Sequence, residues 1–325
     1  MRSLFFKKTT VDLLHESGDR KLKSDEENKM VLFGAIEAGG TKFVCAVGTS
    51  PEDVRAEVRI PTTTPEETIA KVNDFFRQQI KAEGALDAIG IGAFGPVDIH
   101  VKSPTFGWFL NTPKPGWQMV DLVGAIKSEI NVPVGFDTDV NAAALGEYRW
   151  GNAQGLETFL YLTIGTGIGG GGMVNGKLIH GLLHPEMGHI LIPHDLSADP
   201  FPGSCPFHQD CLEGLASGFA IEKRWGQKAS SLPADHPAWE LETHYLTVAL
   251  VNFMLTFSPQ RIIIGGGVME QKQLFPLVRS QVRKEISSYL QISKIINEIE
   301  DYIMPPKLGG RSGIMGAFAL AQQSI

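Results

Sequence analysis

The most distinctive chemistry in this 325-residue chain is a cluster of metal-binding side chains. The segment SCPFHQDC, residues 204–211, holds two of the three cysteines, Cys205 and Cys211, with His208 midway between them. Structural zinc sites use four Cys or His ligands. The upstream segment HPEMGHILIPH contains three candidates for a fourth ligand: His184, His189 and His194. We therefore predict a closed structural zinc site. The alternative is a chance cluster of cysteines without a ligand.

A pair of aspartates supplies a second candidate for chemistry. Asp137 and Asp139 lie in FDTDVNAAALGE, residues 136–147, where a predicted strand runs into a predicted helix. In open α/β folds ligands collect at such strand ends. One aspartate could act as the general base that takes a proton from an attacking hydroxyl, as phosphoryl transfer requires. It could equally be a helix cap. Spacing alone does not choose between the two residues.

Glycine is the third signal. The chain has 36 glycines, and clusters of them lie at 39–40, 165–172, 265–267 and 309–313. The first three clusters follow predicted strands, where successive backbone N–H groups can cradle an anion. Nearby side chains add further donors: Thr41, Lys42, Thr163 and Thr166. The clusters therefore predict a phosphate site. They match neither a Rossmann fingerprint nor a P-loop at a strand–helix junction.

The elements that must position these residues alternate between strand and helix, which indicates an α/β fold. Hairpins with glycine turns are expected at 31–47 and 159–179, and a further strand with a glycine turn at 261–269. The repeated strand–glycine–strand pattern suggests a duplication. Thr64 and Glu67 predict a capping box at the start of a helix over 64–80. Further helices are expected at 121–130, 139–148, 242–257 and 311–322, and further strands at 87–93 and 132–138.

Composition limits the class of protein. The chain is 43% hydrophobic and 20% charged, with a formal net charge of −7, which disfavours a broad nucleic-acid-binding surface. Its apolar runs have the length of strands, so we expect no membrane span. Three cysteines do not make a secreted disulfide framework, and we expect a cytoplasmic protein. Residues 1–30 are expected to form a flexible N-terminal extension, too short for a DNA-binding headpiece.

Together these motifs resemble the ROK family of sugar kinases, in the actin-like ATPase superfamily. The resemblance runs from about residue 31 to the C-terminus through IEAGGTK, DTDVNAAALGE, TIGTGIGGG, HPEMGH, CPFHQDCLEGLASG and RIIIGGGVM. It implies an α/β, two-lobed actin-like ATPase (ribonuclease H-like) fold with an interlobe cleft and a zinc-bound loop. The implied domains are an N-terminal lobe of residues 31–142, completed by the C-terminal helix 311–325, and a C-terminal lobe of residues 143–310 with the zinc loop at 184–213.

The resemblance also implies roles for individual residues, with Asp139 as the catalytic base. The implied nucleotide-binding residues are Glu37, Gly39, Gly40, Thr41, Lys42, Thr163, Gly165, Thr166, Gly167, Gly169, Gly265, Gly266 and Gly267. The implied sugar-binding residues are Asn111, Thr138, Asp139, Glu186, His189 and Glu213. The implied zinc ligands are His189, Cys205, His208 and Cys211. Glu37 and Thr138 stand where the family usually has Asp and Asn, and His208 stands where it usually has a third cysteine.

Within the family, EAGGTK, NTPKPGW (residues 111–117) and the Cys-x2-His-x2-Cys loop look most like the zinc-containing fructokinase branch. This implies ATP-dependent phosphorylation of D-fructose to fructose 6-phosphate, with Mg²⁺ and ATP in the interlobe cleft, a structural Zn²⁺ and a homodimer. No nucleic acid or membrane partner is expected. The alternatives are a glucokinase or mannokinase of the same family and a non-catalytic, sugar-sensing relative such as a transcriptional regulator.

Overall fold

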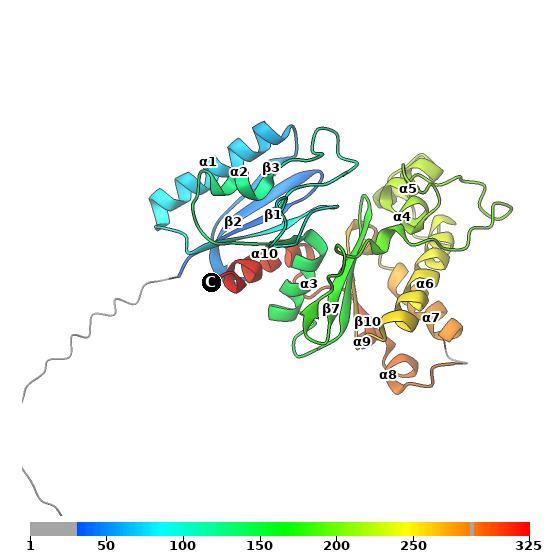
Figure 1. The fold of residues 1–325 in the computed structure, drawn as a ribbon. Helices are drawn as coiled ribbons and strands as arrows, with labels where there is room; N and C mark the ends of the chain where they lie inside the picture. The colour runs from blue at the N-terminus through cyan, green and yellow to red at the C-terminus, as the bar shows by residue number, and fades with distance from the viewer. Residues whose placement is uncertain (1–30, 287–288) are drawn as a thin grey trace, which may run out of the picture. The chain divides into compact units, whose positions relative to one another are not determined.

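The computed structural model describes residues 31–286 and 289–325, so the predicted extension at 1–30 lies outside the described residues. In the described part of the chain, strands form two five-stranded sheets (Figure 1). The first has the order β3-β2-β1-β4-β5, and the second β10-β9-β6-β7-β8. Helices accompany both sheets, so the predicted α/β class is confirmed. The boundaries of the two predicted lobes stay a prediction.

The two sheets are built in the same way. In the first, β1 (Phe33–Ala38), β2 (Lys42–Ser50) and β3 (Asp53–Pro61) form an antiparallel meander, while β4 (Ala88–Ala93) and β5 (Val134–Thr138) add in parallel. The second sheet repeats this with the antiparallel strands β6 (Phe159–Ile164), β7 (Ile168–Val174) and β8 (Lys177–Leu178) and the parallel strands β9 (Ile262–Gly265) and β10 (Ile303–Met304). This shared topology agrees with the repeated strand–glycine–strand pattern of the sequence.

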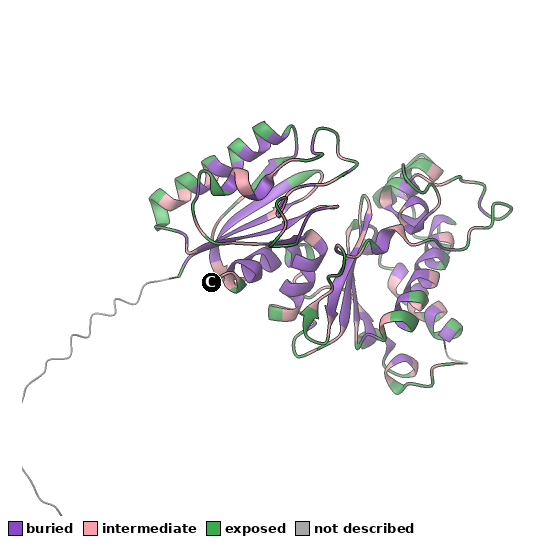
Figure 2. Cartoon of the chain, viewed as in Figure 1, coloured by how far each residue is buried: buried purple, intermediate pink, exposed green. Residues whose placement is uncertain are grey.

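Helices cover both faces of the first sheet. On one face, α1 (Pro65–Glu83) and α2 (Leu122–Lys127) pack with residues such as Phe76 and Ile126 against the strands. On the other face lies α10 (Ser312–Gln323), whose Phe318 contributes to a second cluster. A Cβ at Gly90 of β4 would lie 1.8 Å from the Ala317 carbonyl oxygen, so glycine is required where α10 crosses this strand. Figure 2 shows the central strands of both sheets buried and the outer side of α1 exposed.

The second sheet is also covered on both faces. Its larger apolar cluster includes α6 (Ala238–Phe257) and α7 (Leu274–Ile286). On its other face α3 (Asp139–Trp150) packs against β6 and β7 and also against α10. Helix α3 therefore contacts elements of both sheets. The remaining helices are α4 (Leu212–Ala216), α5 (Gly218–Trp225), α8 (Ser293–Ile296), α9 (Ile299–Tyr302) and the 3₁₀ turns η1 (Met187–His189), η2 (Ala229–Ser231), η3 (Gly267–Glu270) and η4 (Gly309–Arg311).

Helix ends follow the predicted cap chemistry in part. The Thr64 hydroxyl accepts a hydrogen bond from the Glu67 amide at the start of α1, as expected. The Glu67 carboxylate is instead engaged by the Thr63 hydroxyl and by Lys71, so the reciprocal half of the capping box is replaced by local side-chain contacts. Helix α6 begins at Ala238, four residues before the predicted start at 242. No helix among the described residues is long and apolar enough to cross a membrane.

Candidate functional site

A cavity of about 450 Å³ brings several of the predicted residues together. Asp139 and Glu37 lie in its wall with Thr163 and the glycine segment 265–267. The second glycine-rich wall, at 309–313, comes from η4 and the start of α10. The remaining lining residues include Val140, Ala143, Tyr161, Ile264, Met269, Glu270, Phe275, Pro305 and Pro306. The cavity thus joins a potential base, a second carboxylate and two stretches of bare backbone, a composition that suits a phosphorylated ligand.

The structure separates the roles of the two aspartates. Asp137 ends β5 and is buried, and its Oδ1 accepts hydrogen bonds from the Thr138 amide (2.7 Å) and Asn141 Nδ2 (2.8 Å). Its Oδ2 lies 2.7 Å from Nε2 of His180. Asp137 is therefore committed to these contacts. Asp139, at the first position of α3, lines the cavity instead.

The environment of Asp139 suits a general base. Its Oδ1 accepts the Val140 amide at 2.8 Å, which leaves Oδ2 for a ligand. Burial raises the pKa of Asp139 to about 6, although the Val140 amide bond acts in the opposite direction. A carboxylate with such a pKa is ionised at neutral pH and is a better proton acceptor than an ordinary aspartate.

Glu37 is the second carboxylate of the cavity, on β1. Burial, reinforced by the nearby charge of Asp139, raises the pKa of Glu37 to about 7, while Lys42 lowers it. A Cβ at Gly313 would lie 2.6 Å from Cδ of Glu37, so glycine at the start of α10 leaves the space that this glutamate occupies. Two adjacent carboxylates that oppose each other's ionisation favour a bound cation. Oxygen donors of this kind suit Mg²⁺.

The other predicted nucleotide-binding residues lie in two hairpin turns. Gly39, Gly40, Thr41 and Lys42 form the β1–β2 turn, closed by a hydrogen bond from the Gly39 amide to the Lys42 carbonyl (3.0 Å). Gly165, Thr166 and Gly167 form the β6–β7 turn, and Gly169 follows in β7. These residues are not part of the cavity lining given above. Their binding of phosphate stays a prediction.

Of the predicted sugar residues, Glu186 is electrostatically coupled to the base. Burial raises the pKa of Glu186 to about 7, and the charges of Glu213 and Asp139 add to the rise. Glu213, at the start of α4, accepts the Ile168 amide at 2.8 Å, and a Cβ at Gly167 would lie 2.5 Å from its Oε2. Glu213 therefore connects the predicted zinc loop to the β6–β7 turn.

The other predicted sugar residues have different surroundings. The Thr138 hydroxyl accepts the Asn141 amide (3.2 Å) as the N-cap of α3, so its side chain is buried at a helix end. Asn111 is exposed. Contacts of either residue with a sugar stay predictions.

Two further histidines hold this region: His180, which was not predicted, and His184, a candidate zinc ligand that lies outside the metal cluster. His184 is buried, and its Nε2 accepts the Val97 amide at 3.1 Å. The proton of the neutral ring is therefore on Nδ1, which lies 3.5 Å from a carboxylate oxygen of Glu186. Burial lowers the pKa of His184, which favours this neutral form. The hydrogen bond to Asp137 raises the pKa of His180. Spacing missed both roles, because their partners lie far away in the sequence.

The predicted metal ligands His189, Cys205, His208 and Cys211 are brought together, with ligand atoms all within 4.8 Å of one another. Nδ1 of His189 lies 3.6 Å from Sγ of Cys205 and 3.5 Å from Sγ of Cys211, and Nδ1 of His208 lies 3.7 Å from Cys205 Sγ. Zinc bond lengths in a tetrahedron require S···N separations of about 3.6 Å. The residues therefore fit a closed zinc site. The other ring nitrogen of His189 faces Glu213, 3.9 Å away.

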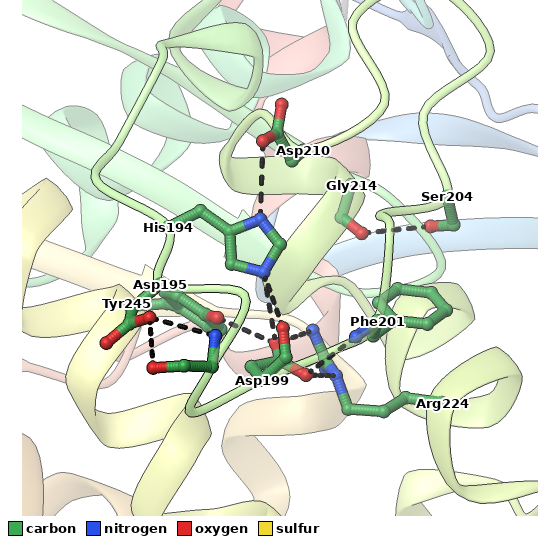
Figure 3. A network of polar contacts seen from close by, with 10 residues as sticks. His194, Asp195, Asp199, Phe201, Ser204, Asp210, Gly214, Arg224 and Tyr245 are labelled. Carbon is green, nitrogen blue, oxygen red and sulfur yellow. Dashed lines mark hydrogen bonds and ion pairs between the residues drawn. The ribbon is translucent and has the colours of Figure 1, made fainter.

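The other candidate ligand, His194, belongs to a separate buried network within the same loop (Figure 3). Its Nδ1 lies 3.3 Å from Asp210, and its Nε2 lies 3.0 Å from the Asp199 carbonyl oxygen. Asp199 also accepts hydrogen bonds from Nε of Arg224 on α5 (3.2 Å) and from the Tyr245 hydroxyl of α6 (2.7 Å), and it forms an ion pair with Nη2 of Arg224 (3.0 Å). The network thus anchors the middle of the loop on two helices through contacts in which no residue of the metal cluster takes part.

The wall at 305–313 and the lining residues Met269, Glu270 and Phe275 were not among the predicted site residues. The glycine cluster at 309–313 was visible, but no recognisable strand precedes it, because β10 has only two residues. That cluster was the available signal for this part of the site.

Comparison with known proteins identifies the family of the chain and agrees with its fold. The ROK family model matches residues 33–324. A fructokinase from Pediococcus pentosaceus is 43% identical over 295 residues, covering 91% of this chain and 99% of the relative. A fructokinase from Zymomonas mobilis is 44% identical over 299 residues, covering 91% and 98%.

Among solved structures, a ROK family glucokinase from Streptomyces griseus in complex with glucose and AMPPNP superposes with a TM-score of 0.67. It is 25% identical, and the match covers 90% of this chain and 99% of that one. The chain belongs to the ROK family.

Proposed function

We propose that this chain is an ATP-dependent fructokinase that transfers the γ-phosphate of ATP to the 6-hydroxyl of D-fructose. The relatives named fructokinase support the sugar, since they are 43–44% identical over nearly the full length of both chains. AMPPNP is, by its name, an analogue of a nucleoside triphosphate. The glucokinase structure solved with it supports the proposal that a nucleotide binds in the cavity.

One observation carries the proposal: Asp139 lies in the wall of the same cavity as the bare glycine segments 265–267 and 309–310. A base without a hydrogen-bond partner on one oxygen therefore faces a space that can hold phosphates. Its neighbour Asp137 has no such freedom, because hydrogen bonds engage both of its oxygens.

In the proposed reaction, Asp139 accepts the proton of the fructose 6-hydroxyl as that oxygen forms a bond to the γ-phosphorus. The bond from the γ-phosphorus to the bridging oxygen breaks at the same time, and its electrons leave with ADP. Glu186 and Glu213 accept hydrogen bonds from other sugar hydroxyls and orient the reacting one. This positioning contributes much of the rate enhancement, since phosphoryl transfer requires little covalent chemistry from the protein.

Two metal ions have proposed places. Glu37 is the carboxylate that would hold Mg²⁺, through water and with Asp139 nearby, and the bound ion would neutralise charge on the phosphate oxygens. His189, Cys205, His208 and Cys211 would hold a structural Zn²⁺, with no open position for chemistry. Because His189 belongs to this cluster and Glu213 adjoins it, the ion would keep the sugar side of the site in place. We also expect a cytoplasmic homodimer, as the family resemblance implies.

The test is a coupled ADP-release assay with fructose, mannose, glucose and N-acetylmannosamine, using metal-replete protein. The proposal expects the highest kcat/KM with fructose. Higher kcat/KM with another sugar would keep the kinase and reject the fructokinase. Sugar binding without turnover would support the non-catalytic alternative.

A further inference from the structure

The carboxylate of Glu147, near the end of α3, is fully buried and accepts four hydrogen bonds. Its Oε2 accepts the amides of Asn152 (2.7 Å) and Lys307 (3.1 Å). Its Oε1 accepts the Leu308 amide and the Ser312 hydroxyl, both at 2.9 Å. Three of the four donors therefore come from a segment about 160 residues further along the chain. Hydrogen bonds to a buried carboxylate are stronger than those between neutral groups.

The segment that Glu147 holds is a wall of the cavity. Pro305, Pro306, Gly309, Gly310 and Ser312 line the cavity, and Lys307 and Leu308 lie between them. A Cβ at Gly309 or Gly310 would meet nothing within 4 Å, so these two residues add no side-chain packing, whereas Leu308 packs against the apolar cluster of α10. The position of this stretch therefore depends on the hydrogen bonds to its backbone as well as on the Leu308 contact. Besides Glu147, the Asn152 side chain contributes by donating to the Pro305 carbonyl (2.9 Å).

The same helix carries the proposed base at its other end. Asp139 begins α3, and Glu147 follows eight residues later, which corresponds to about 12 Å along a helix. The helix is packed between β6 and β7 on one side and α10 on the other. A rigid, buried helix thus joins the proton acceptor to the wall that faces the nucleotide.

We propose that Glu147 is a positioning residue that fixes the 305–312 wall, and with it the nucleotide, at a set place relative to Asp139. This inference rests on the proposed kinase function. Without the Glu147 carboxylate, the amides of Lys307 and Leu308 lose a buried acceptor, and the wall shifts or loosens. Binding of the nucleotide should weaken, whereas binding of the sugar should not change, because the zinc loop holds the sugar side of the site.

The test compares wild type with Glu147→Gln, which keeps the size of the side chain but places an amide among hydrogen-bond donors. Glu222→Gln is the matched control, because Glu222 is an exposed glutamate on α5. We expect the Kd for Mg·AMPPNP, measured by calorimetry, to rise at least about tenfold, or about 1.4 kcal/mol. The KM for fructose should change by less than about twofold. Hydrogen exchange of the Lys307 and Leu308 amides should accelerate.

Two results would overturn the inference. One is an unchanged Kd for Mg·AMPPNP in Glu147→Gln, and the other is an equal rise in the fructose KM, which would indicate a general structural role. If Glu147→Gln does not fold, Ser312→Ala provides the test. This variant removes one of the four hydrogen bonds to Glu147 and should raise the Kd for Mg·AMPPNP by a smaller factor. An unchanged Kd in Ser312→Ala would then reject the inference. Failure of wild type to bind Mg·AMPPNP would instead reject the proposed function, and the inference with it.

Discussion

Replacing Asp139 by Asn should remove the proposed base and also stabilise the fold at neutral and alkaline pH. Burial raises the pKa of Asp139 from 3.8 to about 6. Between these values the folded protein binds more protons than the unfolded chain, so stability falls as the pH rises and the full penalty is present above about pH 6. A difference of about 2.2 pKa units corresponds to about 3 kcal/mol. This is an upper limit, because Asp139 keeps some contact with solvent.

The measurement is urea or thermal unfolding of wild type, Asp139→Asn and the surface control Glu222→Gln at pH 5 and pH 8. Asn does not titrate, so the stability advantage of Asp139→Asn should grow by up to about 1.4 kcal/mol between the two pH values. Any pH-independent effect of the substitution cancels in this difference. An advantage that stays constant or shrinks towards pH 8 would refute the claim that burial penalises the ionised base. Glu222→Gln should show no comparable change.

Three further predictions concern rate, metal and packing. The kcat/KM for fructose should fall about tenfold from pH 7.5 to pH 5, since a base with a pKa of about 6 becomes protonated there; a flat profile would contradict this. Elemental analysis should find no zinc in the Cys211→Ser protein. Its KM for fructose should rise more than its KM for ATP, because Glu213 adjoins the metal loop; equal rises would count against a link between the zinc site and sugar binding. Gly313→Ala should lower the free energy of unfolding by about 1–3 kcal/mol, because its Cβ would lie 2.6 Å from Glu37. Gly181→Ala, with more room around its Cβ, should be nearly neutral.

The parts of the fold that local chemistry determines were predictable from the sequence. Glycine at 39–40 and 165–167 between apolar runs predicted both hairpins, because such turns depend on neighbouring residues only. Pro65 and the Thr64 cap predicted the start of α1. The start of α6 was placed four residues late, because Pro237 and Ala238 give a weak N-terminal signal and the helix is stabilised there by buried Trp239.

The contacts that define the site were less predictable, because they join residues far apart in the chain. The choice between Asp137 and Asp139 could not be made from spacing, since it depends on His180, 43 residues away. Glu147 looked like an ordinary helix residue, because its partners near 307–312 approach it only when α10 packs on α3. Family motifs located the carboxylates, but only the folded chain showed which of them have free oxygens.

The most direct test of the central claim is the rate of ADP release with fructose by wild type and Asp139→Asn, prepared together and shown to contain equal zinc. The account predicts fructose turnover by wild type and a kcat at least about 10²-fold lower in the variant, as expected for loss of a general base. Both proteins should bind Mg·AMPPNP. Comparable kcat values in the two proteins would show that Asp139 is not the base and would contradict the proposed mechanism.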